Sequence, residues 1–136
     1  MGRVLAIDYG AKRVGLAVSD ALQISTRILK FQDETKIRQW LLDYLALEDV
    51  ETIVIGYPVH RDEQKTELTD AIDQLLNFIQ KEAPHIEITK LEESFTSKEA
   101  MSYMIKAGVN KKKRREKGLI DSYSALVILE EYLRNN

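Results

Sequence analysis

Residues 3–19 read RVLAIDYGAKRVGLAVS, and this stretch decides the fold. It contains two runs rich in aliphatic and β-branched residues, 3–9 and 13–19, joined by the short connection 10–12. A connection of this length that begins with glycine is typical of a β-hairpin. We therefore predict that the chain opens with two antiparallel strands and that Asp8 lies near the end of the first.

The rest of the chain alternates between the strand and helix patterns. Further strands are expected near residues 27–31, 51–57 and 86–91. Apolar residues recur every three or four positions from about residue 33 and over 68–79, which predicts two helices. A capping box at Thr96 and Glu99 predicts a third helix that ends at about 108. A final helix is expected over 119–133, where apolar residues would cover most of the helix circumference and indicate burial. The order β-β-β-α-β-α-β-α-α predicts a meander of three antiparallel strands followed by two parallel ones. We expect a single α/β domain over residues 1–136, with a mixed five-stranded sheet flanked by helices.

The composition is typical of a soluble globular protein, with 44% hydrophobic and 31% charged residues among 136. The chain has no cysteine, which excludes disulfides, thiolate metal sites and cysteine nucleophiles. The N-terminus reaches the carboxylate of Asp8 too early for a secretory signal. No apolar run approaches the roughly 20 residues that span a bilayer. We expect a cytoplasmic protein without a membrane partner.

A net charge of −2 hides a strong asymmetry. Residues 98–117 carry eight basic and two acidic side chains, whereas the remainder carries twelve and twenty. The basic run consists of Lys111, Lys112, Lys113, Arg114 and Arg115. It is either a solvated loop or a surface that binds phosphate. Lys12 and Arg13 in the first hairpin are weaker candidates for the same role.

Acidic residues lie at three places that a sheet could bring together. Asp8 is either a carboxylate on a central strand, which is costly unless it is paired or bound to metal, or a turn residue past the strand end. Glu92 and Glu93 close the last strand, and alternation points them to opposite faces without showing which one faces a site. Asp121 begins the final helix, where the helix dipole alone already favours an acid.

Acids at two strand ends and at a helix start could converge on one edge of the sheet. Carboxylate oxygens are the ligands that Mg²⁺ and Mn²⁺ prefer. Two such ions about 4 Å apart can activate water and stabilise the leaving oxygen during phosphodiester hydrolysis. The residues alone therefore indicate a candidate metal site.

Several motifs, in order along the chain, resemble those of the YqgF-type family. They are DYGAKRVGLAVSD at 8–20, IVIGYP at 53–58, LEESFTSKEA at 91–100, and a closing pattern of Gly108-Val109, the basic run and IDSYSALVIL at 120–129. The resemblance covers nearly the whole chain.

Members of this family are described as pre-16S rRNA nucleases and as Holliday junction resolvases. The resemblance implies a ribonuclease-H-like fold with a catalytic, metal-binding triad that falls on Asp8, Glu93 and Asp121. It implies a nuclease that uses Mg²⁺ or Mn²⁺ and processes the 5′ end of pre-16S rRNA in ribosome biogenesis. It also favours the basic run as a nucleic-acid contact.

Two segments depart from the family pattern. Ser94 stands where the family usually has arginine after its two acids, and residues 59–64 lack the usual glycine. Both changes leave the three acids in place and affect only the substrate contacts that the resemblance would imply.

Other interpretations stay open at this point. Cleavage of four-way DNA junctions would require a symmetric dimer, because two opposed strands must be cut together. The hairpin at Asp8 and Gly10 also resembles the phosphate-binding hairpin of actin-like and sugar-kinase ATPases, which need two such domains. A third possibility is a non-catalytic RNA-binding factor for ribosome assembly. The family resemblance implies structured RNA as the preferred partner, with branched DNA as the alternative and either a monomer or a homodimer.

Overall fold

A computed structural model of the chain describes residues 2–58, 67–93 and 97–135, apart from the side chains of Glu93 and Ser97. The described strands are β1 (Arg3–Tyr9), β2 (Arg13–Ser19), β3 (Thr26–Asp33), β4 (Val50–Pro58) and β5 (Glu87–Glu93). The described helices are α1 (Ile37–Leu47), α2 (Glu67–Glu82), α3 (Ser97–Lys106), α4 (Lys111–Arg114) and α5 (Leu119–Arg134), with a 3₁₀ turn η1 (Glu34–Lys36) before α1.

The strands form one mixed sheet in the order β3-β2-β1-β4-β5. β2 pairs antiparallel with both β1 and β3, whereas β4 runs parallel to both β1 and β5. This arrangement confirms the predicted meander followed by parallel strands. The parallel pairs are possible because the connections before β4 and β5 contain the helices α1 and α2. β1 is the central strand, and Asp8 lies within it rather than in the turn beyond.

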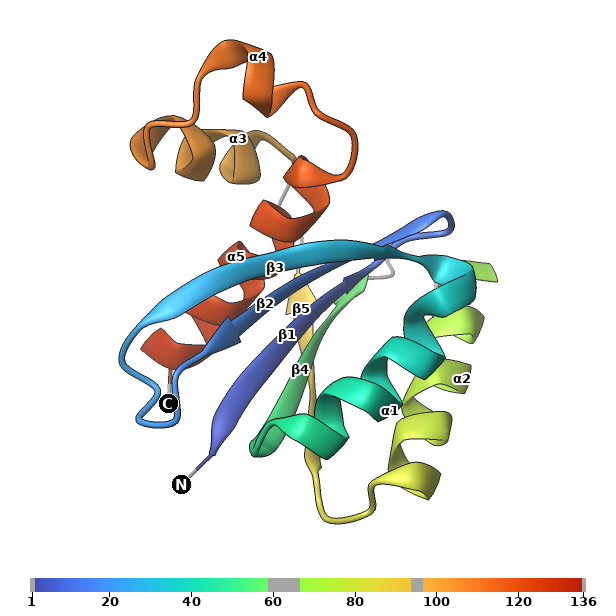
Figure 1. The fold of residues 1–136 in the computed structure, drawn as a ribbon. Helices are drawn as coiled ribbons and strands as arrows, with labels where there is room; N and C mark the ends of the chain where they lie inside the picture. Colours follow the sequence, from blue (N-terminus) through green and yellow to red (C-terminus); the bar gives the residue numbers. More distant parts are fainter. Residues whose placement is uncertain (1, 59–66, 94–96, 136) are drawn as a thin grey trace.

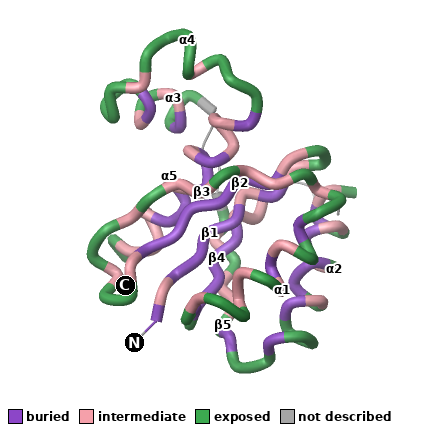
Figure 2. The backbone as a smooth tube through the Cα atoms, viewed as in Figure 1, coloured by how far each residue is buried: buried purple, intermediate pink, exposed green. Residues whose placement is uncertain are grey.

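Helices α1 and α2 cover one face of the sheet, and α5 covers the other (Figure 1). Large aliphatic side chains build the face toward α1 and α2, namely Leu5, Ile7, Val14, Leu16, Val18, Ile53 and Ile55. Figure 2 shows the buried residues concentrated along β1, β2 and β4. Strand alternation sends every second residue of these strands to this face, which forms the larger of the two cores.

The face toward α5 is built from much smaller side chains. Ala6 of β1 and Ala17 of β2 pack in one cluster with Ala125 and Ile128 of α5. A Cβ atom placed on Gly56 of β4 would come within 2.7 Å of Cδ1 of Ile128. Because so little side-chain volume separates the two layers, α5 lies close to the strands. This close packing positions the candidate site.

Helices α3 and α4 lie beyond the N-terminal end of α5 and apart from the sheet (Figure 1). The prediction of a basic loop was wrong in part, because Lys111–Arg114 form the helical turn α4. The side chain of Asn110 caps this turn by accepting a hydrogen bond from the backbone N–H of Lys113 at 2.9 Å. An asparagine cap can begin a helical turn that has no apolar periodicity, which is why the pattern did not predict it.

Other sequence predictions concern element ends and membrane segments. β3 is longer than the predicted 27–31 and runs to the start of η1. Thr96, the first residue of the predicted capping box, lies outside the described residues. In the ranges that the structure describes, no helix is both long and apolar enough to cross a membrane.

Candidate active site

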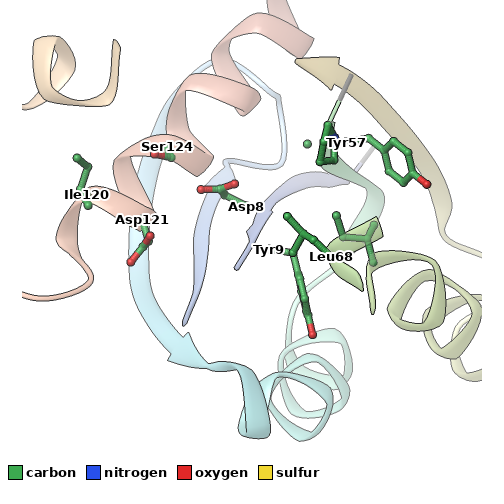
Figure 3. A pocket seen from close by; sticks show the side chains of 10 residues that line it. Asp8, Tyr9, Tyr57, Leu68, Ile120, Asp121 and Ser124 are labelled. Carbon is green, nitrogen blue, oxygen red and sulfur yellow. The ribbon is translucent and has the colours of Figure 1, made fainter. Parts of the chain in front are cut away.

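A pocket of about 390 Å³ opens where the carboxyl ends of β1 and β4 meet the start of α5. It is lined by Asp8, Tyr9, Gly56, Tyr57, Pro58, Leu68, Ile72, Ile120, Asp121 and Ser124. In Figure 3, Asp8 and Asp121 lie on one side of the pocket, and Tyr57 and Leu68 lie on the other. Carboxyl ends of parallel strands are a common position for ligand sites, so this pocket is the candidate active site.

Asp8 approaches the pocket from the central strand. Its neighbours Ile7 and Tyr9 belong to the core under α1 and α2, so strand alternation turns Asp8 toward α5. Burial raises the pKa of Asp8 to about 7, and the negative charge of Asp121 contributes to the increase. A carboxylate at this position is therefore unfavourable at neutral pH unless a positive charge compensates it.

Asp121 can reach the same pocket because β2 has no side chain at Gly15. Gly15 pairs directly with Asp8 in the β1–β2 ladder. A Cβ atom at Gly15 would lie only 1.8 Å from the backbone oxygen of Asp121, so any other residue would push α5 away from the sheet. Gly15 thus sets the separation between the two elements that carry the acids. Hydrophobic periodicity alone does not indicate this role of Gly15, although the small residues Gly15 and Ala17 at alternate positions of β2 are a signal for close packing.

Arg13 lies two residues before Gly15 on β2 and forms an ion pair with Asp121. Its Nε donates a hydrogen bond to Oδ2 of Asp121 at 2.8 Å. Both side chains are less than a third exposed, at 29% and 26%, so solvent screens the pair only partly. If Arg13 contacts nucleic acid, its guanidinium must therefore bind Asp121 and a phosphate at the same time. Lys12, in contrast, is exposed in the hairpin connection.

Glu93, the third predicted acid, closes β5 next to the pocket. Its backbone is paired with that of Pro58, which lines the pocket. The side chain of Glu93 lies outside the described residues, as do Ser94 and residues 59–64. Within the described ranges, no three acidic or histidine side chains come together as a metal-binding group. The complete triad therefore remains a prediction, although the structure brings two of its members to one pocket.

The two described acids fit a divalent cation. Both Asp8 and Asp121 line the same pocket and supply carboxylate oxygens, the donors that Mg²⁺ and Mn²⁺ favour. Burial and, to a smaller extent, the charge of Asp121 both raise the pKa of Asp8 and disfavour its carboxylate form. A cation beside it would offset both the cost of burying the carboxylate and the repulsion between the two acids.

The predicted basic run lies mainly on α4, near the start of α5 (Figure 1). Its exposed members are Lys111, Lys112, Lys113 and Arg115. Arg114 is half-buried, and its Nη1 donates a hydrogen bond to the backbone oxygen of Val109 at 2.8 Å. The four exposed cations are thus accessible to phosphate, whereas Arg114 also stabilises its own turn.

Two tyrosines line the pocket while their hydroxyl groups form contacts with neighbouring acids. The hydroxyl of Tyr9 donates to Oε1 of Glu34 at 2.6 Å, and burial together with this contact raises the pKa of Tyr9 to about 12. The hydroxyl of Tyr57 donates to the Asp73 carboxylate at 3.3 Å. The ammonium group of Lys90 lies 4.5 Å from the centre of the Tyr57 ring. These contacts hold both rings as walls of the pocket.

Known proteins with similar sequences cover nearly the whole chain. Residues 2–135 match the family model described as "RuvX: Holliday junction resolvase". A relative from Flavobacterium psychrophilum is 39% identical, with 98% of this chain and 97% of the relative covered. A relative from Porphyromonas gingivalis is 41% identical, with 99% and 98% covered. Both carry the name "Putative pre-16S rRNA nuclease".

Solved structures with a similar fold confirm the predicted ribonuclease-H-like architecture. RuvC from Thermus thermophilus in complex with a Holliday junction substrate matches with a TM-score of 0.61 and 17% identity, over 99% of this chain and 95% of RuvC. A second Thermus thermophilus RuvC structure gives a TM-score of 0.59 with 13% identity, over 98% and 95%. Because the family model spans 2–135 and the sequence relatives are more than a third identical, the chain belongs to the RuvX family of nucleases, the YqgF-type family that its motifs resemble.

Proposed function

We propose that this chain, as a single domain over residues 1–136, is an endonuclease that depends on a divalent metal ion. Asp8, Glu93 and Asp121 would hold Mg²⁺ or Mn²⁺. The observation that carries the proposal is that Asp8 and Asp121 line the same pocket, where burial raises the pKa of Asp8 to about 7. When bound, such an ion activates water for attack on phosphorus and stabilises the leaving oxygen.

The surrounding residues position these acids and the substrate. Arg13 holds Asp121 through its 2.8 Å hydrogen bond and compensates part of the negative charge. Gly15 keeps α5 close enough for Asp121 to share the pocket with Asp8. The exposed cations of the basic run neutralise backbone phosphates, which supplies affinity that does not depend on sequence.

The proposed substrate is structured RNA, specifically the 5′ end of pre-16S rRNA in the cytoplasm. The names of the Flavobacterium and Porphyromonas relatives support this choice. One active site suffices for cutting a single RNA strand, so a monomer can perform the reaction.

The second candidate function is resolution of four-way DNA junctions. It is favoured by the description of the family model and by the fold shared with RuvC, which has been solved with a Holliday junction. Two opposed strands must be cut together in that reaction, so it requires a homodimer with two such pockets.

Both candidates are tested with end-labelled pre-16S rRNA and a labelled four-way junction, each incubated with Mg²⁺, Mn²⁺ or EDTA. The variants are Asp8→Asn and a matched control, Asp70→Asn, which changes an exposed acid on α2. We expect cutting of the RNA that requires metal, is lost in Asp8→Asn and persists in Asp70→Asn. Cutting confined to the junction, together with a dimer in solution, would establish the second candidate instead.

A binding measurement separates catalysis from RNA binding alone. Calorimetric titration with Mn²⁺ should show a site in the wild-type protein that Asp8→Asn loses. If Mn²⁺ does not bind and neither substrate is cut, while RNA still binds in a salt-dependent way, the enzyme proposal is wrong. The protein would then be a non-catalytic factor for ribosome assembly.

A further inference from the structure

A second cavity, which we call the β3 groove, lies between the edge strand β3 and the segment that leads into α5. Its volume is about 330 Å³. The apolar part of its lining includes Ile28, Phe31 and Leu119, and its charged part consists of Lys30, Glu116 and Lys117. The three charged side chains are exposed, whereas the three apolar ones are half-buried. The groove therefore combines half-buried apolar side chains with exposed charged ones, two of them basic and one acidic.

Phe31 is held in place at this groove by Gly118. The backbone of Gly118 is left-handed, with φ of +86°, and a Cβ atom there would lie 2.2 Å from both Cδ1 and Cε1 of the Phe31 ring. The ring thus packs directly on the backbone before α5. In addition, the Ser122 hydroxyl donates a hydrogen bond to the backbone oxygen of Leu29 at 2.8 Å, which ties β3 to α5. A ring fixed in this way can accept a stacked base with little further loss of side-chain entropy.

The β3 groove and the active-site pocket flank the same helical turn. Ile120, Asp121 and Ser124 line the pocket, whereas Leu119 and Ser122 line the groove. At 3.6 residues per turn these two sets point to opposite sides of α5. A helix with its side chains is about 10–12 Å across, and stacked nucleotides are about 3.4 Å apart along a strand. A strand that crosses the start of α5 would therefore place in the groove a nucleotide about three steps from the bond that is cut.

We propose that the β3 groove binds one nucleotide of a single-stranded segment of the substrate, with its base stacked on Phe31 and its phosphates paired with Lys30 and Lys117. The two lysines outweigh Glu116, and the basic run ends at Arg115, two residues before Lys117 in the chain. A base within a duplex is already stacked on its neighbours and is not free to enter the groove, so a single strand is required. This inference rests on the proposed nuclease function for the identity of the strand.

The test uses RNA hairpins with a single-stranded tail, and binding is measured by fluorescence anisotropy in EDTA so that no strand is cut. One set of probes carries an abasic site at each tail position in turn, and one probe has no tail. Base stacking on an aromatic side chain contributes about 1–3 kcal/mol, so one abasic position should weaken binding to the wild-type protein about tenfold. Phe31→Leu should weaken binding of the intact probe by a similar factor and abolish the effect of that abasic position.

The lysines are tested separately through the salt dependence of binding. Lys30→Ala and Lys117→Ala should each reduce the slope of log affinity against log salt by about 0.7, the value for one phosphate of a single strand. Lys81→Ala, an exposed lysine near the end of α2, is the matched control and should change nothing. A DNA tail that binds as well as RNA would show that the groove recognises the base and phosphate, whereas weaker binding of DNA would show that it also recognises the ribose.

Two results would overturn the inference. One is that the abasic site weakens binding to a folded Phe31→Leu protein by the same factor as it weakens binding to the wild type. The other is that the wild-type protein binds the tailed and untailed hairpins with equal affinity. If Phe31→Leu folds poorly, unchanged salt slopes in both lysine variants overturn the inference in its place. Metal-dependent cutting of pre-16S rRNA by the wild-type protein is measured independently. The proposed nuclease function can therefore hold even if the β3 groove binds no nucleotide.

Discussion

The sheet presents large side chains to α1 and α2 and small ones to α5. Leu5, Leu16 and Ile55 are fully buried on the first face, whereas Ala6 and Ala17 belong to the cluster under α5. Large interlocking side chains bury much apolar surface, which is the main source of folding stability. Small ones bury less but let a helix approach closely.

The difference suggests that the two faces serve different purposes. The face toward α1 and α2 supplies most of the core, but it carries neither of the two acids that line the pocket. The face toward α5 carries Asp8 on β1, and its small residues bring Asp121 to the same pocket. Stability and site geometry should therefore respond separately to substitutions on the two faces.

The largest expected effect is on stability, from Leu16→Ala on the face toward α1 and α2. Removing a fully buried leucine side chain should lower the free energy of unfolding by about 2–5 kcal/mol. Urea denaturation measures this change. At a temperature where the variant remains folded, its rate of RNA cutting should equal that of the wild type. A loss of rate in folded Leu16→Ala protein would show that the two faces are not independent.

Gly15→Ala on the opposite face should act mainly on activity. Its Cβ would overlap the backbone of Asp121, and a displacement of a catalytic group by about 1 Å can reduce a rate about 100-fold. Gly56→Ala is the control, because it meets only the flexible end of the Ile128 side chain and should cost less. If the Gly15→Ala protein cut RNA at the wild-type rate, this result would contradict the proposed close packing.

Asp8→Asn should stabilise the metal-free protein at neutral pH. The pKa of Asp8 rises from 3.8 to about 7 on folding. At a pH between these two values, the folded state therefore holds a proton that the unfolded state has lost. Stability contributed by the neutral carboxyl is present at low pH and is lost as pH rises toward 7. The melting temperature of Asp8→Asn should therefore match the wild type near pH 4 and exceed it by several degrees at pH 8. Scanning calorimetry in EDTA measures both, and equal melting temperatures at pH 8 would count against an uncompensated charge.

Arg13→Ala should have the smallest effect. Partly exposed ion pairs contribute up to about 1 kcal/mol, so the loss in unfolding free energy should stay near that value and shrink in 1 M salt. Lys12→Ala, the exposed neighbour, should change stability by less. A double-mutant cycle with Asp121→Asn isolates the pair. A coupling above about 2 kcal/mol would mean that Arg13 does more than pair with one carboxylate.

The strands and most helices were predictable because their signals are local. Alternating aliphatic residues and the glycine connection mark the first hairpin, three- and four-residue spacing marks α1 and α2, and a run that is apolar around most of the helix circumference marks α5. The turn α4 escaped prediction because its helical start depends on one side chain, that of Asn110. Asp8 and Asp121 were recognised as candidates from their positions at element ends, and the family motifs supported the choice.

Other features of the site had no local signal. Arg13 and Asp121 are 108 positions apart in the chain, and their ion pair exists only because α5 crosses β2 at Gly15. The β3 groove likewise depends on Phe31 packing against Gly118 across a long sequence separation. No periodicity within one element reports such contacts.

The sequence by itself determined the order and type of the strands and of the four long helices, the family, and the acids near the ends of β1, β5 and the start of α5. These follow from hydrophobic period, turn residues and motifs, which act over a few neighbouring positions. Only the tertiary structure decided that Asp8 shares a pocket with Asp121, that Arg13 is paired, and that a groove lies on the other side of α5. These depend on how closely a helix can approach a sheet, which is set by side-chain volumes contributed from distant parts of the chain.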